Sequence, residues 1–242
     1  MPWPATPIDA RDLPGWYGKL ASLGDFAQRR LPPEWVQACD RWLSAALVGG
    51  REVLGERWLE AYLTAPVLRF GWAPGVVDAQ WWFGLLMPSC DSVGRYFPLL
   101  IAQARAQPPQ DRIALDHLER WYDHLAQAAM HTLNDSAGSV EALEAALHDA
   151  PPWPTPGGGA AVVSRAGAEG EHHRLARAPA LSQWLHALAT REFAARLGGC
   201  SVWWRVTESG DYDSVDIVRG LPDGRALAAM LTGVGIAQRE AA

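Results

Sequence analysis

The sequence predicts an α/β protein built as a layered sandwich, in which helices flank a sheet. Three apolar runs of strand length occupy residues 66–73, 81–89 and 96–104, and turn residues separate them. Their nearly continuous hydrophobicity is typical of strands that are covered on both faces. Segments with helical periodicity precede and follow these runs, which favours helices as the covering layers.

The composition is that of a globular protein. Hydrophobic residues make up 49% and charged residues 20% of the 242 residues, and there are 13 tryptophans. The formal net charge of −6 argues against nucleic-acid binding, which needs a basic face. The cysteines at 39, 90 and 200 form no C-x-x-C pair, and no apolar run is long enough to span a membrane. We therefore expect reduced thiols and a cytoplasmic location.

The first half of the chain is expected to hold an arm and two helices before the strands. Residues 1–14 contain four prolines and no apolar periodicity, which predicts an extended arm. A single domain should then run over residues 15–242, opening with an apolar segment interrupted by glycines. An amphipathic helix should begin after Pro32 and end at the Gly-Gly pair at 49–50, and a second helix should cover residues 51–63.

After the strands, the sequence predicts two helices and then a loop. Helical periodicity covers residues 111–133, and the next helix, at 139–150, has Ser139 in position to cap it. The apolar positions of the first helix are Ile113, Leu115, Leu118, Trp121, Tyr122, Leu125 and Met130. Residues 151–179 are rich in Pro and Gly and then polar without a clear period, which predicts a flexible loop.

The end of the chain is expected to add a helix, a hairpin and a last helix. The helix should cover residues 181–197 and end at a second Gly-Gly pair. Strands are predicted at 201–206 and 214–220, with the turn TESGDYD between them. A helix at 221–231 follows. In the tryptophan pairs at 81–82 and 203–204 the strand period should send neighbouring side chains to opposite faces of the sheet.

Residues 88–98, PSCDSVGRYFP, place a thiol, a carboxylate and a guanidinium between two apolar runs. Cys90 followed by Arg95 resembles the loop of a cysteine phosphatase, in which a thiolate attacks phosphorus and an arginine holds the phosphoryl oxygens. The spacing is one residue too short for such a loop, and a strand-like run follows where a helix is needed. The preferred interpretation is a tight turn closed by Gly94, across which Asp91 and Arg95 pair.

Nucleotide and metal sites find little support in the sequence. The single lysine, Lys19, is not followed by Ser or Thr, so it cannot belong to a phosphate-binding loop. His117, His124 and His131 recur every seven residues. This spacing corresponds to about 10.5 Å along a helix, too far for two of them to bind one ion. We therefore interpret them as a stripe of half-exposed side chains.

The segment GDYDSVD offers a further set of carboxylates, at a spacing that could attract a hard cation. These are Asp211, Asp213 and Asp216. Because they lie between two predicted strands, where Gly and Asp are common turn formers, a hairpin turn is the preferred interpretation. No G-x-S-x-G segment occurs, and no nucleophile has an evident base. We expect no cofactor, no metal and no catalysis.

Three segments, in this order and at this spacing, resemble a known family. They are GWYGKLASLGDFAQRRLP (15–32), WLEAYLTAPVLRF (58–70) and MPSCDSVGRYFPL (87–99). The chain resembles the TagF family, also called ImpM, of bacterial type VI secretion accessory proteins. The later WWR strand and RGLPDGRALAAML are similar to the family's C-terminal part, so the resemblance spans about residues 15–232. The family more often has a proline at the position of Ala21 and a polar or basic residue at that of Leu23.

The resemblance implies a cytoplasmic three-layer α/β/α sandwich, with a mixed central sheet flanked by helices and no known catalysis. Members are post-translational negative regulators of type VI secretion. The implied partner is the FHA-domain scaffold protein of the secretion apparatus, and neither nucleic-acid binding nor membrane insertion is implied. The function that we expect is therefore regulation through protein–protein interaction.

A partner-binding surface is accordingly the site that we expect, formed by the turn at 91–99 beside the Gly-Asp-Phe segment at 24–26. The candidate residues are Tyr17, Lys19, Asp25, Phe26, Arg29, Asp91 and Arg95. Two alternatives from other classes stay open. One is a small phosphatase or hydrolase that uses Cys90 or an Asp-bound metal, and the other is a structural subunit of the secretion assembly.

Overall fold

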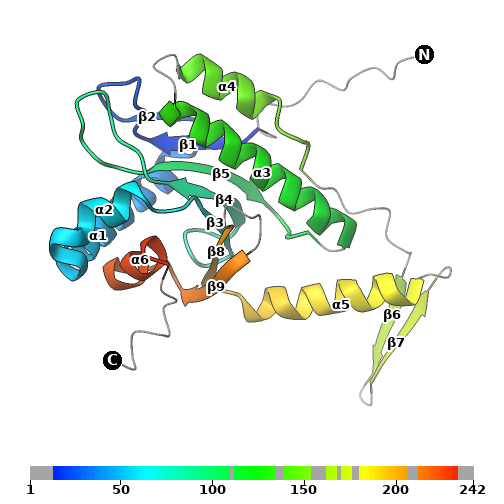
Figure 1. The fold of residues 1–242 in the computed structure, drawn as a ribbon. Coiled ribbons are helices and arrows are strands. Elements are labelled where there is room, and N and C mark those ends of the chain that lie inside the picture. The colour runs from blue at the N-terminus through cyan, green and yellow to red at the C-terminus, as the bar shows by residue number, and fades with distance from the viewer. Residues whose placement is uncertain are drawn as a thin grey trace, which may run out of the picture.

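A computed structural model describes residues 13–109, 112–134, 139–153, 162–167, 170–175, 180–206 and 212–233. Its centre is a seven-stranded sheet with the strand order β2-β1-β5-β4-β3-β8-β9 (Figure 1). The strands are β1 (Gly15–Gly18), β2 (Ala27–Arg29), β3 (Leu68–Trp72), β4 (Trp81–Met87), β5 (Leu99–Arg105), β8 (Cys200–Val206) and β9 (Tyr212–Arg219). The protein is therefore of the α/β class, as predicted.

All neighbouring strands of this sheet pair in the antiparallel sense. The prediction of a mixed sheet is wrong in this respect. Continuous hydrophobicity shows that a strand is covered on both faces, but it does not show the direction of the strand. A parallel neighbour needs a crossover of about a dozen residues or more, and the connections at 73–80 and 88–98 are shorter than that.

The three predicted strands are confirmed as β3, β4 and β5, and all side chains of β4 are buried. Strands β1 and β2 were not predicted, because their sequences GWYG and AQR are short and lack an apolar run. The structure explains why position 18 of that segment is a glycine. Its φ of +136° is unfavourable for other residues, and its Cα faces the backbone of Pro98, where a Cβ would collide.

The helices are α1 (Pro33–Leu54), the short 3-10 helix η2 (Gly55–Arg57), α2 (Trp58–Leu63), α3 (Arg112–Asn134), α4 (Val140–His148), α5 (Ala180–Arg196) and α6 (Gly224–Leu231). The predicted N-cap of α4 is confirmed, because the backbone N–H of Ala142 donates to Ser139 Oγ at 3.1 Å. In α3, the predicted apolar positions Ile113, Leu115 and Met130 are exposed. Within the described part of the chain, no helix is both long and apolar enough to cross a membrane.

The end of α1 corrects the prediction. The helix continues through Gly49 and Gly50 to Leu54. A Cβ on Gly224, the first residue of α6, would lie 2.5 Å from the Cα of Gly49, and a Cβ on Gly50 would lie 2.9 Å from the indole of Trp58. The two glycines therefore allow α1 to pack closely on α6, and they do not end the helix.

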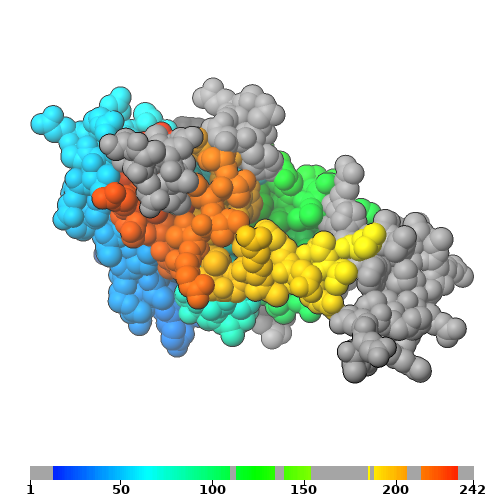
Figure 2. Space-filling model, turned by 90° about the horizontal axis from the view of Figure 1, so that it is seen from below, coloured from blue at the N-terminus to red at the C-terminus, as the bar shows by residue number. Residues whose placement is uncertain are grey.

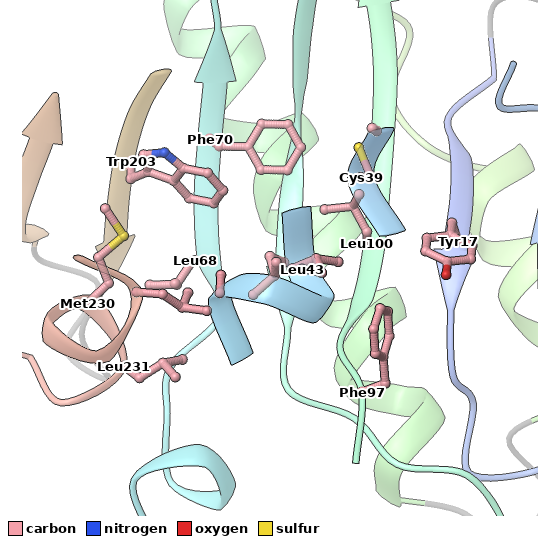
Figure 3. Close-up of a cluster of buried hydrophobic side chains, with 14 of the residues drawn as sticks. Tyr17, Cys39, Leu43, Leu68, Phe70, Phe97, Leu100, Trp203, Met230 and Leu231 are labelled. Carbon is pink, nitrogen blue, oxygen red and sulfur yellow. The ribbon is translucent and has the colours of Figure 1, made fainter. Parts of the chain in front are cut away.

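Two clusters of buried side chains hold the helices to the sheet. One joins α1, α2 and α6 to the strands and includes Leu43, Phe70 and Trp203 (Figure 3). The other joins α3 and α4 to the strands and includes Leu85 and Trp121. As predicted, Trp81 and Trp82 belong to different clusters, and so do Trp203 and Trp204.

A second, separate sheet lies within the predicted flexible loop at 151–179. It is a hairpin of β6 (Val162–Gly167) and β7 (Gly170–Leu175), which the sequence analysis did not predict. The segments 154–161 and 176–179 of that loop lie outside the described residues. So do residues 1–12 of the predicted arm and residues 207–211 of the TESGDYD turn.

Candidate functional site

Asp91 is the buried centre of the turn that connects β4 to β5, with only 2% of its surface exposed. Lys19, just after β1, is also buried, and its Nζ lies 2.8 Å from Asp91 Oδ2. The Nε of Arg95 lies 2.6 Å from the same oxygen. One carboxylate oxygen therefore binds two cationic groups, of which Lys19 lies 72 residues before Asp91 in the sequence.

The second carboxylate oxygen of Asp91 holds the turn itself. The backbone N–H groups of Val93 and Arg95 donate to Oδ1 at 3.1 and 2.8 Å. The backbone of Asp91 accepts from Gly94 N–H at 3.0 Å and donates to Arg95 O at 3.1 Å. Gly94 has a φ of +80°, which favours glycine at this position. The predicted turn, closed by Gly94 and bridged by Asp91 and Arg95, is confirmed.

These contacts decide the charge of Asp91. Burial on its own would raise the pKa of the carboxyl group, but the hydrogen bonds from Lys19, from the backbone and side chain of Arg95 and from the backbone of Val93 outweigh it. The pKa of Asp91 therefore lies well below its ordinary value. The group is a fixed anion whose oxygens both have donors.

Arg95 also connects the turn to the segment that precedes β2. Its Nη2 donates to the carbonyl of Gly24 at 2.6 Å. Beside this contact, the backbone N–H of Ser92 donates to the carbonyl of Leu23 at 2.9 Å. The Gly-Asp-Phe segment and the turn are thus fastened together, as expected from the sequence.

Three aromatic rings pack under this junction. Phe26 stacks on Tyr17 with 5.9 Å between ring centroids and meets Phe97 edge-on at 4.8 Å. The Nζ of Lys19 lies 4.9 Å from the centroid of Phe26, at the distance of a cation–π contact. Tyr17 OH donates to Asp40 at 2.5 Å. Burial and this hydrogen bond raise the pKa of Tyr17, so its hydroxyl stays protonated.

Two polar residues that were not among the predicted candidates, Tyr62 and Ser89, stabilise the site by hydrogen bonds. Tyr62 OH donates to the carbonyl of Ser89 at 2.9 Å and accepts from the Ser89 N–H at 3.1 Å. Ser89 Oγ donates to the carbonyl of Lys19 at 2.8 Å. Tyr62 lies on α2, far from the turn in sequence, and nothing in its local pattern signals this contact.

The outer side of the junction is apolar and accessible. Val93 is 69% exposed, Phe26 44% and Tyr96 38%. Asp25 is also exposed, and its Oδ1 accepts from the backbone N–H of Phe26. We call Phe26, Val93 and Tyr96, together with the exposed side chains of Asp25 and Arg95, the turn surface. Val93 and Tyr96 were not among the predicted site residues, although both lie within the predicted turn.

Arg29 is the one predicted candidate that the structure does not bring to this place. In the pairing of β1 with β2, Arg29 lies directly opposite Trp16. The side chain of Trp16 belongs to the cluster under α3 and α4, whereas that of the neighbouring Tyr17 belongs to the cluster on the other face of the sheet. Burial would raise the pKa of Glu144, at α4, but hydrogen bonds from Arg30 and Trp16 lower it, and the charge of Arg29 adds to this effect. Arg29 therefore faces α4, on the other side of the sheet.

The geometry around Cys90 differs from a phosphatase loop. Cys90 is half-buried and forms an isolated bridge with Tyr96. The chain after Arg95 enters strand β5, so no helix N-terminus follows that could hold phosphoryl oxygens. In the described ranges, no three His, Cys, Asp or Glu side chains gather at a metal-binding distance. Asp211 lies outside those ranges, and so does the side chain of Asp213, of which only the backbone is described.

The histidine stripe of α3 is present as predicted. His117 and His131 are exposed and His124 is half-buried. The Nε2 of His124 lies 2.6 Å from the carbonyl of Ala146 on α4, and since a carbonyl can only accept, this nitrogen carries the proton. The stripe joins two helices and has no link to the turn surface.

Comparisons with known proteins now define the class. Residues 15–150 match a family model described as the TagF N-terminal domain, type VI secretion system-associated. This match, which includes the whole turn and the Gly-Asp-Phe segment, places the chain among the type VI secretion-associated proteins. More narrowly, the chain belongs to the TagF family.

A solved structure supports the same assignment. The crystal structure of PA0076 from Pseudomonas aeruginosa PAO1 is similar to this chain, with 33% sequence identity and a TM-score of 0.69. The similarity covers 92% of this chain and 95% of that chain. It therefore extends well beyond the region that the family model matches. No curated protein sequence matches this chain.

Proposed function

We propose that this protein is a non-enzymatic, post-translational negative regulator of type VI secretion. It acts in the cytoplasm by binding the FHA-domain scaffold protein of the secretion apparatus. The observation that carries the proposal is the turn surface, whose apolar and aromatic side chains are exposed. The ion pairs of Lys19 and Arg95 with Asp91 hold this surface in place, and it lies in the part of the chain that matches the family model. Tyr and Arg, the residue types of Tyr96 and Arg95, are enriched among binding hot spots.

The chemistry of the site supports binding over catalysis. A general base needs a free lone pair at a reacting proton, but both oxygens of Asp91 already accept hydrogen bonds inside the protein. Its lowered pKa also makes it a poor proton acceptor. Cys90 has no histidine or carboxylate hydrogen-bonded to it among the contacts of the described residues, so no activated thiolate is evident.

The candidate residues then divide into two roles. Lys19 and Asp91 are buried, and they hold the junction without touching a partner. Phe26, Val93 and Tyr96 reach solvent and would make the contact. Arg95 does both, because its Nε binds Asp91 while 59% of its side chain is exposed. The scaffold would thus meet an apolar centre with a cationic and an anionic group beside it.

The architecture belongs to the same proposal. The cluster under α1, α2 and α6 and the cluster under α3 and α4 take alternate side chains of the same strand, β4. This alternation supports the three-layer α/β/α arrangement that the family resemblance implies. In that arrangement the turn surface lies at one end of the central strands, next to the start of β5.

An affinity pull-down tests the function. The tagged protein would be recovered from a lysate of its own cells, and the proteins that accompany it identified by mass spectrometry. We expect the FHA-domain scaffold among them, and we expect Val93→Asp to reduce its recovery about tenfold or more, as for a residue at the centre of an interface. The matched control is Val48→Asp on α1, where the valine is 61% exposed and remote in sequence from the turn. Both variants should melt at the wild-type temperature.

Other outcomes would point to the alternatives. Recovery without the scaffold, combined with phosphatase activity that Cys90→Ser abolishes, would establish the enzymatic hypothesis. Constant co-purification with the secretion apparatus, equal for wild type and Val93→Asp, would instead favour a structural subunit. Equal losses for Val93→Asp and Val48→Asp would show that the turn surface has no special role.

A further inference from the structure

A groove of about 400 Å³ lies on one face of the sheet, and Tyr17 and Phe97 lie on the opposite face. Its floor is formed by the sheet and its walls by α3 and α5, and its lining is almost entirely apolar. Aromatic rings make up much of this lining, namely Trp81, Phe83, Phe193 and Trp204. The volume falls in the range of about 300–1,000 Å³ that is usual for sites that bind a ligand.

Among the described residues, the helix that forms one wall is only partly covered. Figure 2 views the face of the molecule that α5 and β9 form. None of the α5 side chains that the structure describes is fully buried, and Phe193, which points into the groove lining, is 52% exposed. Leu115, on the facing wall of α3, is 49% exposed. Because most helical stability comes from packing of an apolar face, an occupant of the groove would stabilise α5.

A tryptophan between two prolines already packs on the aromatic residues of the groove floor. Trp153, within Pro-Trp-Pro at 152–154, packs on Phe83 at 4.8 Å between ring centroids and on Trp121 at 5.2 Å. The guanidinium carbon of Arg105 lies 4.8 Å from the centroid of the Trp153 ring. Phe83 also lines the groove, so Trp153 already occupies one end of a continuous aromatic surface.

The same three residues occur a second time, near the start of the sequence. Residues 2–7 are Pro-Trp-Pro-Ala-Thr-Pro, and residues 152–156 are Pro-Trp-Pro-Thr-Pro. We propose that the groove is the docking site for residues 2–7 of the same chain, with Trp3 placed between Phe83 and Phe193. Proline-rich segments suit this role because they are extended and lose little entropy when they dock on aromatic grooves. The inference is independent of the partner-binding proposal.

The position of Leu13 makes the contact reachable. Leu13 lines a small cavity together with Gln80 and Trp82, at the start of β4, and Trp81 beside them belongs to the groove. The segment from Trp3 to Leu13 can extend over about 30 Å, at roughly 3.3 Å per residue. Passing from one face of a sheet to the layer on its other face takes only about 10 Å.

Hydrogen–deuterium exchange of the full chain tests the proposal. We expect the amide hydrogens of residues 188–196 in α5 to exchange roughly tenfold faster in Trp3→Ala, the factor that burial of one large apolar side chain supplies. Thr6→Ala is the control within the arm and should leave this exchange unchanged. Phe193→Asp should raise exchange in residues 3–12, whereas Leu185→Asp should not, although Leu185 is 49% exposed on the same helix.

Two results would overturn the proposal. Equal exchange of α5 in wild type and Trp3→Ala would show that the arm does not cover the groove. A second copy's arm would be the occupant if the protection of α5 from exchange disappears on dilution and light scattering shows a dimer at high concentration. Equal melting temperatures of Trp3→Ala and wild type would separate these outcomes from simple unfolding.

Discussion

At the scale of single residues, Asp91 does more than pair with one cation. It joins Lys19, Arg95 and two backbone N–H groups at one point. An unpaired carboxylate at this depth would be strongly unfavourable, so the donors are what allows it to be buried. Removing one of them changes the fold locally as well as the charge.

The lowered pKa of Asp91 gives a signed prediction for stability against pH. A group whose pKa is lower in the folded state stabilises the fold above its unfolded pKa, about 3.8, and this contribution is lost as the pH falls below that value. We expect Asp91→Asn to melt at a lower temperature than wild type at neutral pH. The difference between the two melting temperatures should shrink steadily below about pH 4. A difference that stays constant with pH would contradict the assigned ion cluster.

A pair of tryptophans offers a second comparison at this scale. Trp72 and Trp203 are 0% and 1% exposed. The indole N–H of Trp203 donates to Ser201 Oγ at 2.8 Å, whereas that of Trp72 has no hydrogen-bond partner in the described structure. Replacement by Phe removes similar volume from both sites. We expect Trp203→Phe to lower the free energy of unfolding by about 1 kcal/mol more than Trp72→Phe, measured by urea denaturation. Equal losses would show that this hydrogen bond contributes nothing.

At the scale of elements, the close approach of α1 to α6 constrains the residues at their contact. A Cβ on Gly224 would lie 2.5 to 2.7 Å from backbone atoms of Gly49 and Gly50, which cannot move aside as a flexible side chain could. We expect Gly224→Ala to destabilise the protein by about 1–3 kcal/mol, although alanine favours helix formation. In Gly24→Ala the new Cβ would meet nothing nearer than 3.7 Å, so this control should unfold at the wild-type urea concentration.

Most of the elements could be predicted from the sequence, because long apolar periods and turn residues are local signals. The errors have physical causes. Gly49 and Gly50 resemble a helix end in sequence, but they serve a contact with a helix about 175 residues away, which no local pattern shows. The strand β1 was missed because its glycines weaken the strand pattern, while the pairing with β5 supplies its stability.

The candidate site was predictable to a similar degree. Asp91, Arg95 and the Gly-Asp-Phe segment could be associated because the family resemblance joins them, and the Asp91–Arg95 turn is short. The side of the sheet on which Arg29 lies could not be predicted, because β2 itself was not recognised and the register with β1 decides the face. The contribution of Tyr62 depends on the packing of α2, which is a tertiary property.

At the scale of the whole molecule, the two clusters of buried side chains share their strands. Trp82 and Leu86 of β4 belong to one cluster, and Trp81 and Leu85 belong to the other. Loss of one helical layer would therefore expose strands that the other layer needs. Neither side of the sheet is expected to be stable alone.

We accordingly predict one cooperative unfolding transition for the body of the protein. Urea unfolding followed by far-ultraviolet circular dichroism and by tryptophan fluorescence should give coincident curves. The steepness of the curve should be the same for both probes, because each reports exposure of the whole sheet. Separate midpoints would show that α3 and α4 can dissociate while α1 and α6 remain folded.

The ion cluster beneath the turn has a consequence for how a partner would bind. With Arg95 fixed to both Asp91 and the carbonyl of Gly24, the backbone on either side of Phe26 and Val93 has little freedom left to lose. Ordering of loops and side chains is a large part of the cost of association. A surface that is already rigid in the free protein would be expected to bind as a nearly rigid body, with its affinity set mainly by how slowly the complex dissociates.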